Sequence, residues 1–324
     1  MKQKFSLPLV NAHTHAAMVA FRGMGADLPL ENWLNDCIWP MEAKTVNPEF
    51  VYNETKKAIE EMRSNGIAAF MDMYFFEDAA ARAAEEMKMP AVLDFFNNKD
   101  LERTELLLKK HKNCAYVKTS VAPHSSYMVV EKNLIIAKDL AKQYGAIYQL
   151  HIAETKKEFD DCLIRTGLTP IGHLEKIGVL DENSVLVHCV WLTDEDIAII
   201  AKRKCKVVHC PLSNLKLGSG IAPVKKLLDA GVVVAIGTDG AASSDRLDVW
   251  EAGKFAALLQ KGTNLDASVL PIKEVIRMMT VNGMKALNLR SLNGKTIEDI
   301  EEEIEKTNFD YFYSLQSGDV DFKI

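Results

Sequence analysis

Several features of membrane, secreted and nucleic-acid-binding proteins are missing from this 324-residue sequence. No apolar run approaches the roughly 20 residues that a membrane-spanning helix requires. Residues 1–8 hold no hydrophobic signal-peptide core and the six cysteines lie far apart, so we expect a cytoplasmic protein with reduced thiols. The 39 basic residues are mixed with 45 acidic ones and form no stripe for a phosphate backbone. We therefore expect neither nucleic acid nor a membrane as a partner.

What the sequence does contain is a regular alternation of apolar, strand-like runs and helical patterns. Near-continuous apolar strands indicate a parallel sheet that is covered on both faces, and eight such strands close a barrel. We predict an α/β fold, a (β/α)8 or TIM barrel, in one catalytic domain over residues 1–290. A C-terminal tail over residues 291–324 is expected to add a short acidic helix at 298–305 and a strand-like aromatic segment at 309–315. The eight predicted strands span residues 7–10, 67–73, 90–96, 115–122, 146–152, 184–190, 206–212 and 232–238.

The connection between the first predicted strand and the first predicted helix is unusually long. It covers residues 16–46 and contains Trp33 and Trp39. A structureless connection of this length is usually functional, and its tryptophans suit a lid over a pocket. The alternative is a surface flap that is packed by its own aromatic side chains.

A His-x-His motif formed by His13 and His15 follows the first predicted strand. Alternate residues of a strand share a face, so both imidazoles point the same way and form half of a metal site. Two histidines with ordinary structural partners are the alternative. His151, His188 and Asp239 lie at the ends of later predicted strands, where barrel enzymes place their active sites. Three imidazoles and one carboxylate satisfy a first-row divalent ion and leave one position open for water.

Two further residues near these strand ends suit proton transfer and charge stabilisation. Glu154 follows His151 by three residues, so its carboxylate can reach the water and the leaving nitrogen. The alternative is an acidic residue that favours a helix N-terminus. Since the other three histidines and Asp239 already make four ligands, we assign His188 a different role, which is to hydrogen-bond the developing oxyanion or the nucleophile. A structural histidine of the barrel is the alternative.

Six motifs together resemble the amidohydrolase superfamily, and within it the methylthioadenosine and S-adenosylhomocysteine deaminases and their chlorohydrolase relatives. The resemblance implies that Glu154 moves protons and that His188 assists. It also implies that Trp33, Glu42 and His124 line a nucleoside pocket. It implies one divalent metal ion, expected to be zinc with iron or manganese as alternatives, whose ligands are His13, His15, His151 and Asp239. The motifs lie at residues 10–15, 122–125, 151–155, 187–189, 213–223 and 237–242.

Two features depart from the pattern of that superfamily. Relatives build a small β-sandwich from segments on both sides of the barrel, whereas here residues 1–6 alone precede the first strand and the tail lacks the matching sequence. We therefore expect the sandwich to be missing and the chain to associate, most simply as a homodimer, so that apolar surface is covered. Relatives also carry an arginine near the end of the third strand, where this chain has Asp94. Asp94 predicts a weak preference for a homocysteine carboxylate and better use of substrates with a neutral or cationic 5′ group.

The predicted activity is metal-dependent hydrolytic deamination of an adenine-type nucleoside to the inosine-type product and ammonia. Adenosine, methylthioadenosine and S-adenosylhomocysteine are the expected types of substrate. Glu154 is expected to protonate a ring nitrogen, and Asp239 to accept a proton from the attacking hydroxide. Glu42 is expected to accept hydrogen bonds from two ribose hydroxyl groups. The alternatives are another ring amidine, such as guanine, a chloro-triazine or a pyrimidine, and a non-catalytic binding barrel.

Overall fold

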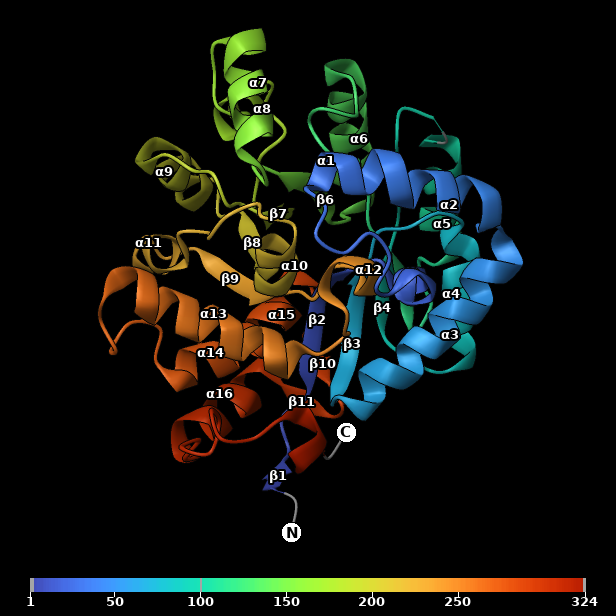
Figure 1. The fold of residues 1–324 in the computed structure, drawn as a ribbon. Helices are drawn as coiled ribbons and strands as arrows, with labels where there is room; N and C mark the ends of the chain where they lie inside the picture. The colour runs from blue at the N-terminus through green and yellow to red at the C-terminus, as the bar shows by residue number, and fades with distance from the viewer. Residues whose placement is uncertain (1–2, 100, 323–324) are drawn as a thin grey trace.

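The computed structural model describes residues 3–99 and 101–322, and a barrel of parallel strands forms its centre (Figure 1). The strands form two four-stranded sheets with the orders β2-β3-β4-β5 and β6-β7-β8-β9. Every pairing within these two sheets is parallel. The strands are β2 Leu9–Thr14, β3 Ile67–Asp72, β4 Ala91–Leu93, β5 Val117–Thr119, β6 Tyr148–Ile152, β7 Ser184–His188, β8 Lys206–His209 and β9 Val233–Ile236.

Backbone hydrogen bonds join the two sheets into one closed barrel. Between the β5 and β6 segments, the Val121 N–H donates to Ile147 O at 2.7 Å, and the Gln149 N–H donates to Val121 O at 3.1 Å. At the other seam, the Asp239 N–H after β9 donates to His13 O of β2 at 3.0 Å. The predicted (β/α)8 barrel is therefore confirmed, with its strands in the predicted order along the chain.

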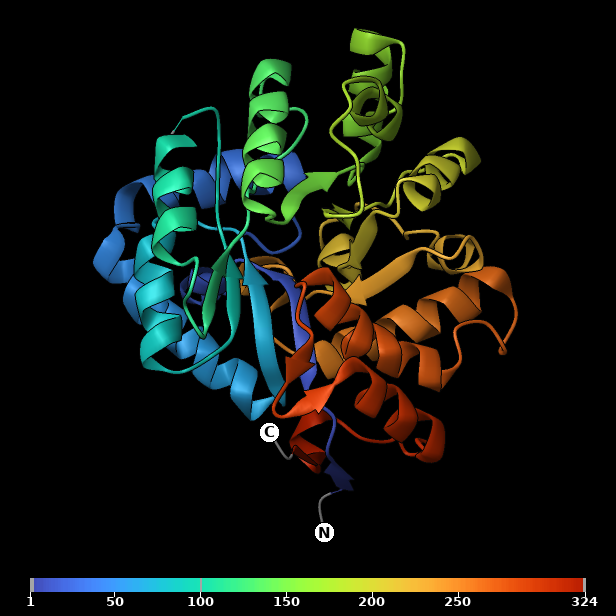
Figure 2. The ribbon, with the colours of Figure 1, turned by 180° about the vertical axis from the view of Figure 1, so that it is seen from behind.

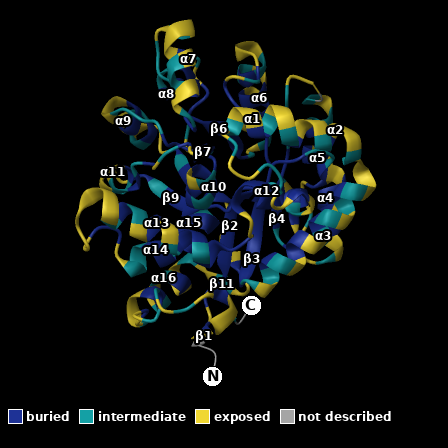
Figure 3. Cartoon of the chain, in the orientation of Figure 1, coloured by how far each residue is buried: buried dark blue, intermediate teal, exposed yellow. Residues whose placement is uncertain are grey.

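Helices cover the outside of the barrel, and every position of β2, β3, β6 and β7 is buried (Figure 3). Burial on both faces explains why the strands read as apolar runs. Helix α3 shows how the cover forms: the Asn47 side chain accepts from Phe50 N at 3.0 Å as an N-cap, Pro48 occupies the first turn, and the apolar face is buried. The helices that pack around the strands are α3 Pro48–Ser64, α4 Glu77–Glu86, α5 Leu101–Lys110, α6 Glu131–Tyr144, α7 Lys156–Thr166, α8 Pro170–Lys176, α9 Asp194–Lys202, α11 Val224–Asp229 and α13 Val249–Asn264.

The long connection after β2 is largely helical, which corrects the prediction of a structureless lid at residues 16–46. Trp33 and Ile38 are buried at helical spacing against the core, and this packing favours helix over an open loop. The segment runs across the barrel mouth in Figure 1, above the ends of the strands. Its elements are the 3₁₀ helix η1 Ala16–Phe21, α1 Leu30–Asn32, the π-helical turn η2 Trp33–Ile38 and α2 Trp39–Thr45.

The helical pattern of residues 272–287 divides into α14 Ile272–Met279 and α15 Val281–Ala286. Thr280 lies between them with φ −124° and ψ −91°, outside the helical region. A Cβ at Gly283 would lie 2.6 Å from the Cβ of Val10, so glycine lets α15 approach β2 closely. The break therefore turns α15 onto the barrel.

A terminal layer packs below the barrel, where the strands begin (Figures 1 and 2). Strand β1 Gln3–Phe5 pairs in parallel with β12 Val320–Phe322. The predicted acidic helix is present as α16 Ile297–Lys306, but residues 309–315 form turns, and the strand of the tail lies at β12 instead. Phe312 is fully buried with its ring centroid 4.9 Å from that of Trp250, so these aromatic side chains pack inward on α13. The remaining elements of the layer are β10 Ser291–Leu292, β11 Lys295–Thr296 and η3 Ser317–Asp319.

Among the described residues, no helix is both long and apolar enough to cross a membrane.

Candidate active site

Four of the predicted residues meet at the ends of the barrel strands. His13 lies on β2 and His15 directly follows it, His151 lies on β6, and Asp239 follows β9. One ligand atom of each lies within 4.8 Å of those of the other three. His151 Nε2 is 3.1 Å from His13 Nε2, and His15 Nε2 is 3.0 Å from Asp239 Oδ1. The structure therefore brings the predicted ligand set together.

The partners of these side chains fix which atoms face the cluster. His151 Nδ1 lies 3.0 Å from His124 O, and His15 Nδ1 contacts Met73 O, so each Nδ1 donates to a backbone carbonyl and each Nε2 is the ring nitrogen left for the cluster. The Nε2 atoms of these two rings and a carboxylate oxygen of Asp239 lie together. This group of nitrogen and oxygen atoms fits a divalent cation. The hydrogen bonds from Nδ1 to the backbone carbonyls orient the two rings, as is usual for histidines that bind a metal ion.

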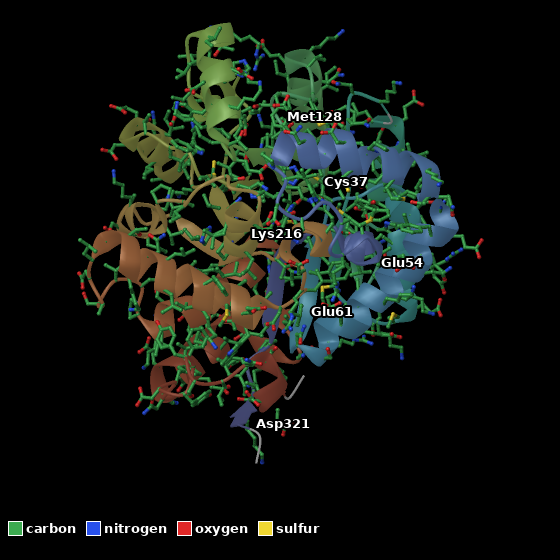
Figure 4. All side chains as sticks on the ribbon, viewed as in Figure 1. Cys37, Glu54, Glu61, Met128, Lys216 and Asp321 are labelled. Carbon is green, nitrogen blue, oxygen red and sulfur yellow. The ribbon has the colours of Figure 1, made fainter. Side chains whose placement is uncertain are left out.

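Asp239 is held by hydroxyl groups from two short helices. Its Oδ2 accepts from Ser213 Oγ of α10 Pro211–Lys216 at 2.6 Å and from Ser243 Oγ of α12 Ala241–Ser244 at 3.0 Å. Lys216, labelled in Figure 4, ties the two helices together, because its Nζ lies 2.8 Å from Asp245 Oδ1 and 3.3 Å from Ala242 O. Oδ1 of Asp239 is thus left for the cluster. Sequence reasoning missed both serines, although Ser213 lay within one of the six motifs.

Close packing of the backbone sets the distance between β9 and β2. A Cβ at Gly237 would lie 2.9 Å from His13 O and 2.8 Å from Val208 Cγ1. Glycine is therefore required for the approach that brings Asp239 beside His13 and His15.

Glu154 lies just past β6, and its side chain faces the cluster. Its Oε2 is 3.7 Å from His188 Nε2, and its Oε1 is 3.5 Å from Ser219 Oγ. Burial and the nearby negative charge of Asp239 raise the pKa of Glu154 to about 8, so this carboxyl group keeps a proton at neutral pH. A carboxyl group of this kind is suited to proton transfer.

His188 ends β7 with the backbone in the left-handed region, at φ 78°. Its Nδ1 accepts from Asn214 Nδ2 at 3.0 Å, so the proton of the neutral ring sits on Nε2, which faces Glu154. Burial lowers the pKa of His188 to about 4, which keeps the ring neutral. Asn214 was not predicted as a site residue, although it lies in the same motif as Ser213.

The predicted substrate residues line the same cavity as this cluster. Glu42 is buried, and its Oε1 accepts from Tyr74 Oη at 2.7 Å. Trp33 donates from Nε1 to Met24 O at 3.1 Å, which holds its ring in the wall. Met128, labelled in Figure 4, belongs to the wall near α1. The residues that line this cavity include His15, Trp33, Glu42, Tyr74, His124, His151, Glu154, His188 and Asp239.

Asp94 takes a different place from the one that the sequence suggested. It is fully buried, and its carboxylate accepts from Ala122 N at 2.9 Å and from Thr104 Oγ1 at 3.0 Å. Asp94 is not among the described residues that line the cavity. The structure therefore places Asp94 within the barrel wall, where its carboxylate is hydrogen-bonded, and the preference among 5′ groups stays a prediction.

The profile of the amidohydrolase family matches residues 8–296. The chain belongs to this family. The predicted resemblance to the amidohydrolases is thereby confirmed over most of the described chain.

Curated and solved amidohydrolases resemble the chain over most of its length. A 5-methylthioadenosine/S-adenosylhomocysteine deaminase of Aquifex aeolicus is 39% identical over 322 residues, covering 96% of this chain and 74% of that protein. A 5′-deoxyadenosine deaminase of Methanothrix thermoacetophila is 41% identical over 290 residues, covering 87% and 69%. The crystal structure of an adenosine deaminase from Xanthomonas campestris with bound zinc superposes with TM-score 0.86 at 35% identity, covering 90% and 69%. An atrazine chlorohydrolase from Arthrobacter aurescens, at 21% identity and TM-score 0.82 over 90% and 73%, shares the fold.

These relatives confirm the predicted enzyme class of this amidohydrolase, which is a hydrolytic deaminase. The family, the zinc-bound relative and the four-residue cluster together support a divalent metal. The chain spans about two thirds to three quarters of the length of the curated relatives.

Proposed function

We propose that this amidohydrolase removes the 6-amino group of an adenine-type nucleoside by hydrolysis and releases ammonia. One observation carries the proposal: His15, His151 and Asp239 of the four-residue cluster, the proton-carrying Glu154 and the buried carboxylate of Glu42 face one cavity. The first two suit hydrolysis of a ring amidine. Glu42 suits a ribose diol, because a buried carboxylate needs hydrogen-bond donors.

We assign the metal to His13, His15, His151 and Asp239, with zinc as the ion and iron or manganese as the alternatives that the same ligands accept. A divalent ion held there would lower the pKa of water to about 7 and so supply hydroxide near neutral pH. Elemental analysis should find about one equivalent of metal per chain. Removal by a chelator should abolish ammonia release, and adding back each ion in turn should identify the active one.

The residues of the chain divide the proton transfers among them. Glu154 delivers its proton to a ring nitrogen of the adenine, and Asp239 takes the proton of the attacking water. His188 donates from Nε2 to the oxygen that adds at C6. Asp239 then passes the proton it took to N6, the remaining hydroxyl proton returns to Glu154 as the C6=O bond forms, the C6–N6 bond breaks, N6 leaves as ammonia, and the ring becomes that of inosine. Loss of ammonia release in Glu154→Gln with the metal retained would separate this enzyme from a binding barrel.

Trp33, Glu42 and His124 are our candidates for substrate contacts. Tyr74 occupies Oε1 of Glu42 and leaves Oε2 for the ribose hydroxyl groups. Trp39 and Tyr127 line both this cavity and an outer one of about 490 Å³, so a group on the 5′ carbon has space to enter it. Asp94 is not among the described residues that line either cavity, so it sets no limit on the size of the 5′ group.

The experiment measures ammonia release by the metal-loaded protein, and chloride release where the substrate is a chloro-triazine. The panel contains adenosine, 5′-deoxyadenosine, methylthioadenosine, S-adenosylhomocysteine, guanine, a chloro-triazine and cytidine. We expect the adenosine derivatives to give the highest kcat/KM. Preference for guanine, the triazine or cytidine would move the assignment to another ring amidine, and inertness toward the whole panel would contradict deamination.

A further inference from the structure

The turn that carries Glu154 has a strained backbone. Strand β6 ends at Ile152, and Ala153 then adopts a left-handed conformation with φ 52° before α7 begins. The left-handed region is unfavourable for a residue with a Cβ, so contacts around the turn must hold Ala153 in this conformation. Among the described residues, the polar contacts of the Glu154 side chain are the long ones to Ser219 and His188, at 3.5 and 3.7 Å. Its direction therefore depends on the backbone beneath it.

A second glutamate supplies contacts to this turn. Glu158 Oε1 accepts from Ala153 N at 3.0 Å, and Glu158 Oε2 accepts from Glu154 N at 2.8 Å. Glu158 is only 7% exposed. On the other side of the turn, Ala153 O accepts from Val190 N and from Trp191 N, both at 2.9 Å. The peptide groups around Ala153 are thus held from α7 and from the segment after β7.

Ordinary helix capping does not account for these bonds. In α9 and α16 the third helical residue, Asp196 or Asp299, bonds back to the N–H of the capping threonine. In α7 the cap Thr155 accepts from Glu158 N at 3.1 Å in the usual way. The carboxylate of Glu158, however, reaches past Thr155 to the two preceding N–H groups. Glutamate is one methylene longer than aspartate, which permits this reach.

We propose that Glu158 is a positioning residue that fixes the direction of Glu154 by binding two successive backbone N–H groups. Only a side chain with two acceptor oxygens satisfies both donors. The proposal rests on the proposed function, because Glu158 acts on the reaction only through Glu154, the residue that delivers the proton. Glu158 itself is not proposed to contact the reacting ring.

The test compares Glu158→Gln and Glu158→Ala with the wild type. Gln keeps one acceptor and Ala keeps none, so kcat should fall about 10-fold in the first and about 100-fold in the second, as expected for displacement of a catalytic group by about 1 Å. KM is measured with adenosine, which carries no large 5′ group to reach the outer cavity that Glu158 also lines, and it should stay within about twofold. Hydrogen exchange of the Ala153 and Glu154 amides should accelerate in the same order. That readout requires no substrate.

A double-mutant cycle separates positioning from general damage. In a Glu154→Gln background, adding Glu158→Gln should leave the residual single-turnover rate unchanged, because the group to be positioned is already absent. The matched control is Asp196→Asn, which alters the cap of α9 and should leave kcat unchanged. Metal content and thermal midpoint are measured for every variant.

Three results would overturn the proposal: wild-type kcat in both Glu158 variants, equal losses in the cycle with and without Glu154, or unchanged exchange of the two amides. If the wild-type protein deaminates none of the nucleosides, the proposed function fails instead. The exchange experiment then still decides whether Glu158 holds the turn.

Discussion

Glu154 and Asp239 are carboxyl groups of one cavity, and their surroundings drive their pKa values in opposite directions. Burial raises the pKa of Glu154 to about 8, and the charge of Asp239 adds to this effect. Burial acts on Asp239 too, but hydrogen bonds from His13 and His15 outweigh it and hold its pKa well below the usual range. One group thus keeps a proton to give while the other stays ionised. A pair separated in this way can act as acid and base at the same pH.

The pH dependence of the reaction follows from Glu154. A raised pKa means that the proton is present below about pH 8 and is lost as the pH rises through that value. Since Glu154 must carry the proton that it delivers, kcat/KM should fall about tenfold per pH unit once the pH exceeds the pKa of Glu154. A cation in the cluster favours the ionised form of Glu154, so we expect this decline to begin at or below about pH 8. Glu154→Gln should show no such decline, and a decline at the same pH in that variant would contradict the assignment.

Glu42 is expected to recognise the ribose through its free oxygen. Hydrogen bonds to a charged group contribute about 1.5–3 kcal/mol, so Glu42→Ala should lower kcat/KM for adenosine by about 10- to 100-fold. The same variant should change little with 2′,3′-dideoxyadenosine, which offers no diol. Tyr74→Phe should give a smaller loss in the same direction, because it frees Glu42 to rotate. An unchanged profile for Glu42→Ala would refute the contact.

At the scale of the elements, the seam between β2 and β9 decides whether the site assembles. Gly237→Ala would place a Cβ 2.9 Å from His13 O. Because that oxygen belongs to the backbone of β2, the clash can be relieved only if a strand moves. We expect a loss of about 1–3 kcal/mol in the free energy of unfolding, together with reduced metal content. The matched control is Gly262→Ala in α13, where nothing lies within 4 Å of the added Cβ. That control should be stabilising by about 0.5–1 kcal/mol. Urea denaturation and elemental analysis measure both effects, and equal behaviour of the two variants would contradict the role of the seam.

At the scale of the whole molecule, the tail contributes to the stability of the barrel. Phe312 is fully buried, and its ring packs against Trp250 of α13. Phe312→Ala should therefore cost about 3–5 kcal/mol in the free energy of unfolding. kcat should stay unchanged, because the terminal layer lies at the opposite end of the barrel from Glu154. If Phe312→Ala, or a chain without residues 291–324, were as stable as the wild type, the tail would not contribute to the stability of the barrel.

Association of the chain remains a separate prediction. Phe255, Leu258 and Leu265 are exposed by 39%, 55% and 94% along and just after α13, and apolar surface of this kind favours contact with a second copy. Light scattering at micromolar concentration should give the mass of a homodimer. A compact monomer over the whole concentration range would contradict this expectation.

The sequence by itself determined the architecture and the chemical identity of the candidate site. Burial on both faces forces barrel strands to be apolar throughout, so their positions can be read from the chain without knowing the partners. Parallel strands of a barrel share one catalytic end, so His13, His151 and Asp239 could be expected to meet although they are far apart in sequence. These inferences depend only on local pattern and on the topology of the fold.

Only the tertiary structure decided which side chains support that site. Ser213 and Asn214 act on Asp239 and His188 from 26 residues away, and Tyr74 acts on Glu42 from 32. Whether a serine, an asparagine or Asp94 faces the cavity or the wall depends on how strands and helices close around it. No local pattern carries that information, because it arises from packing between segments that the chain brings together only when the barrel closes.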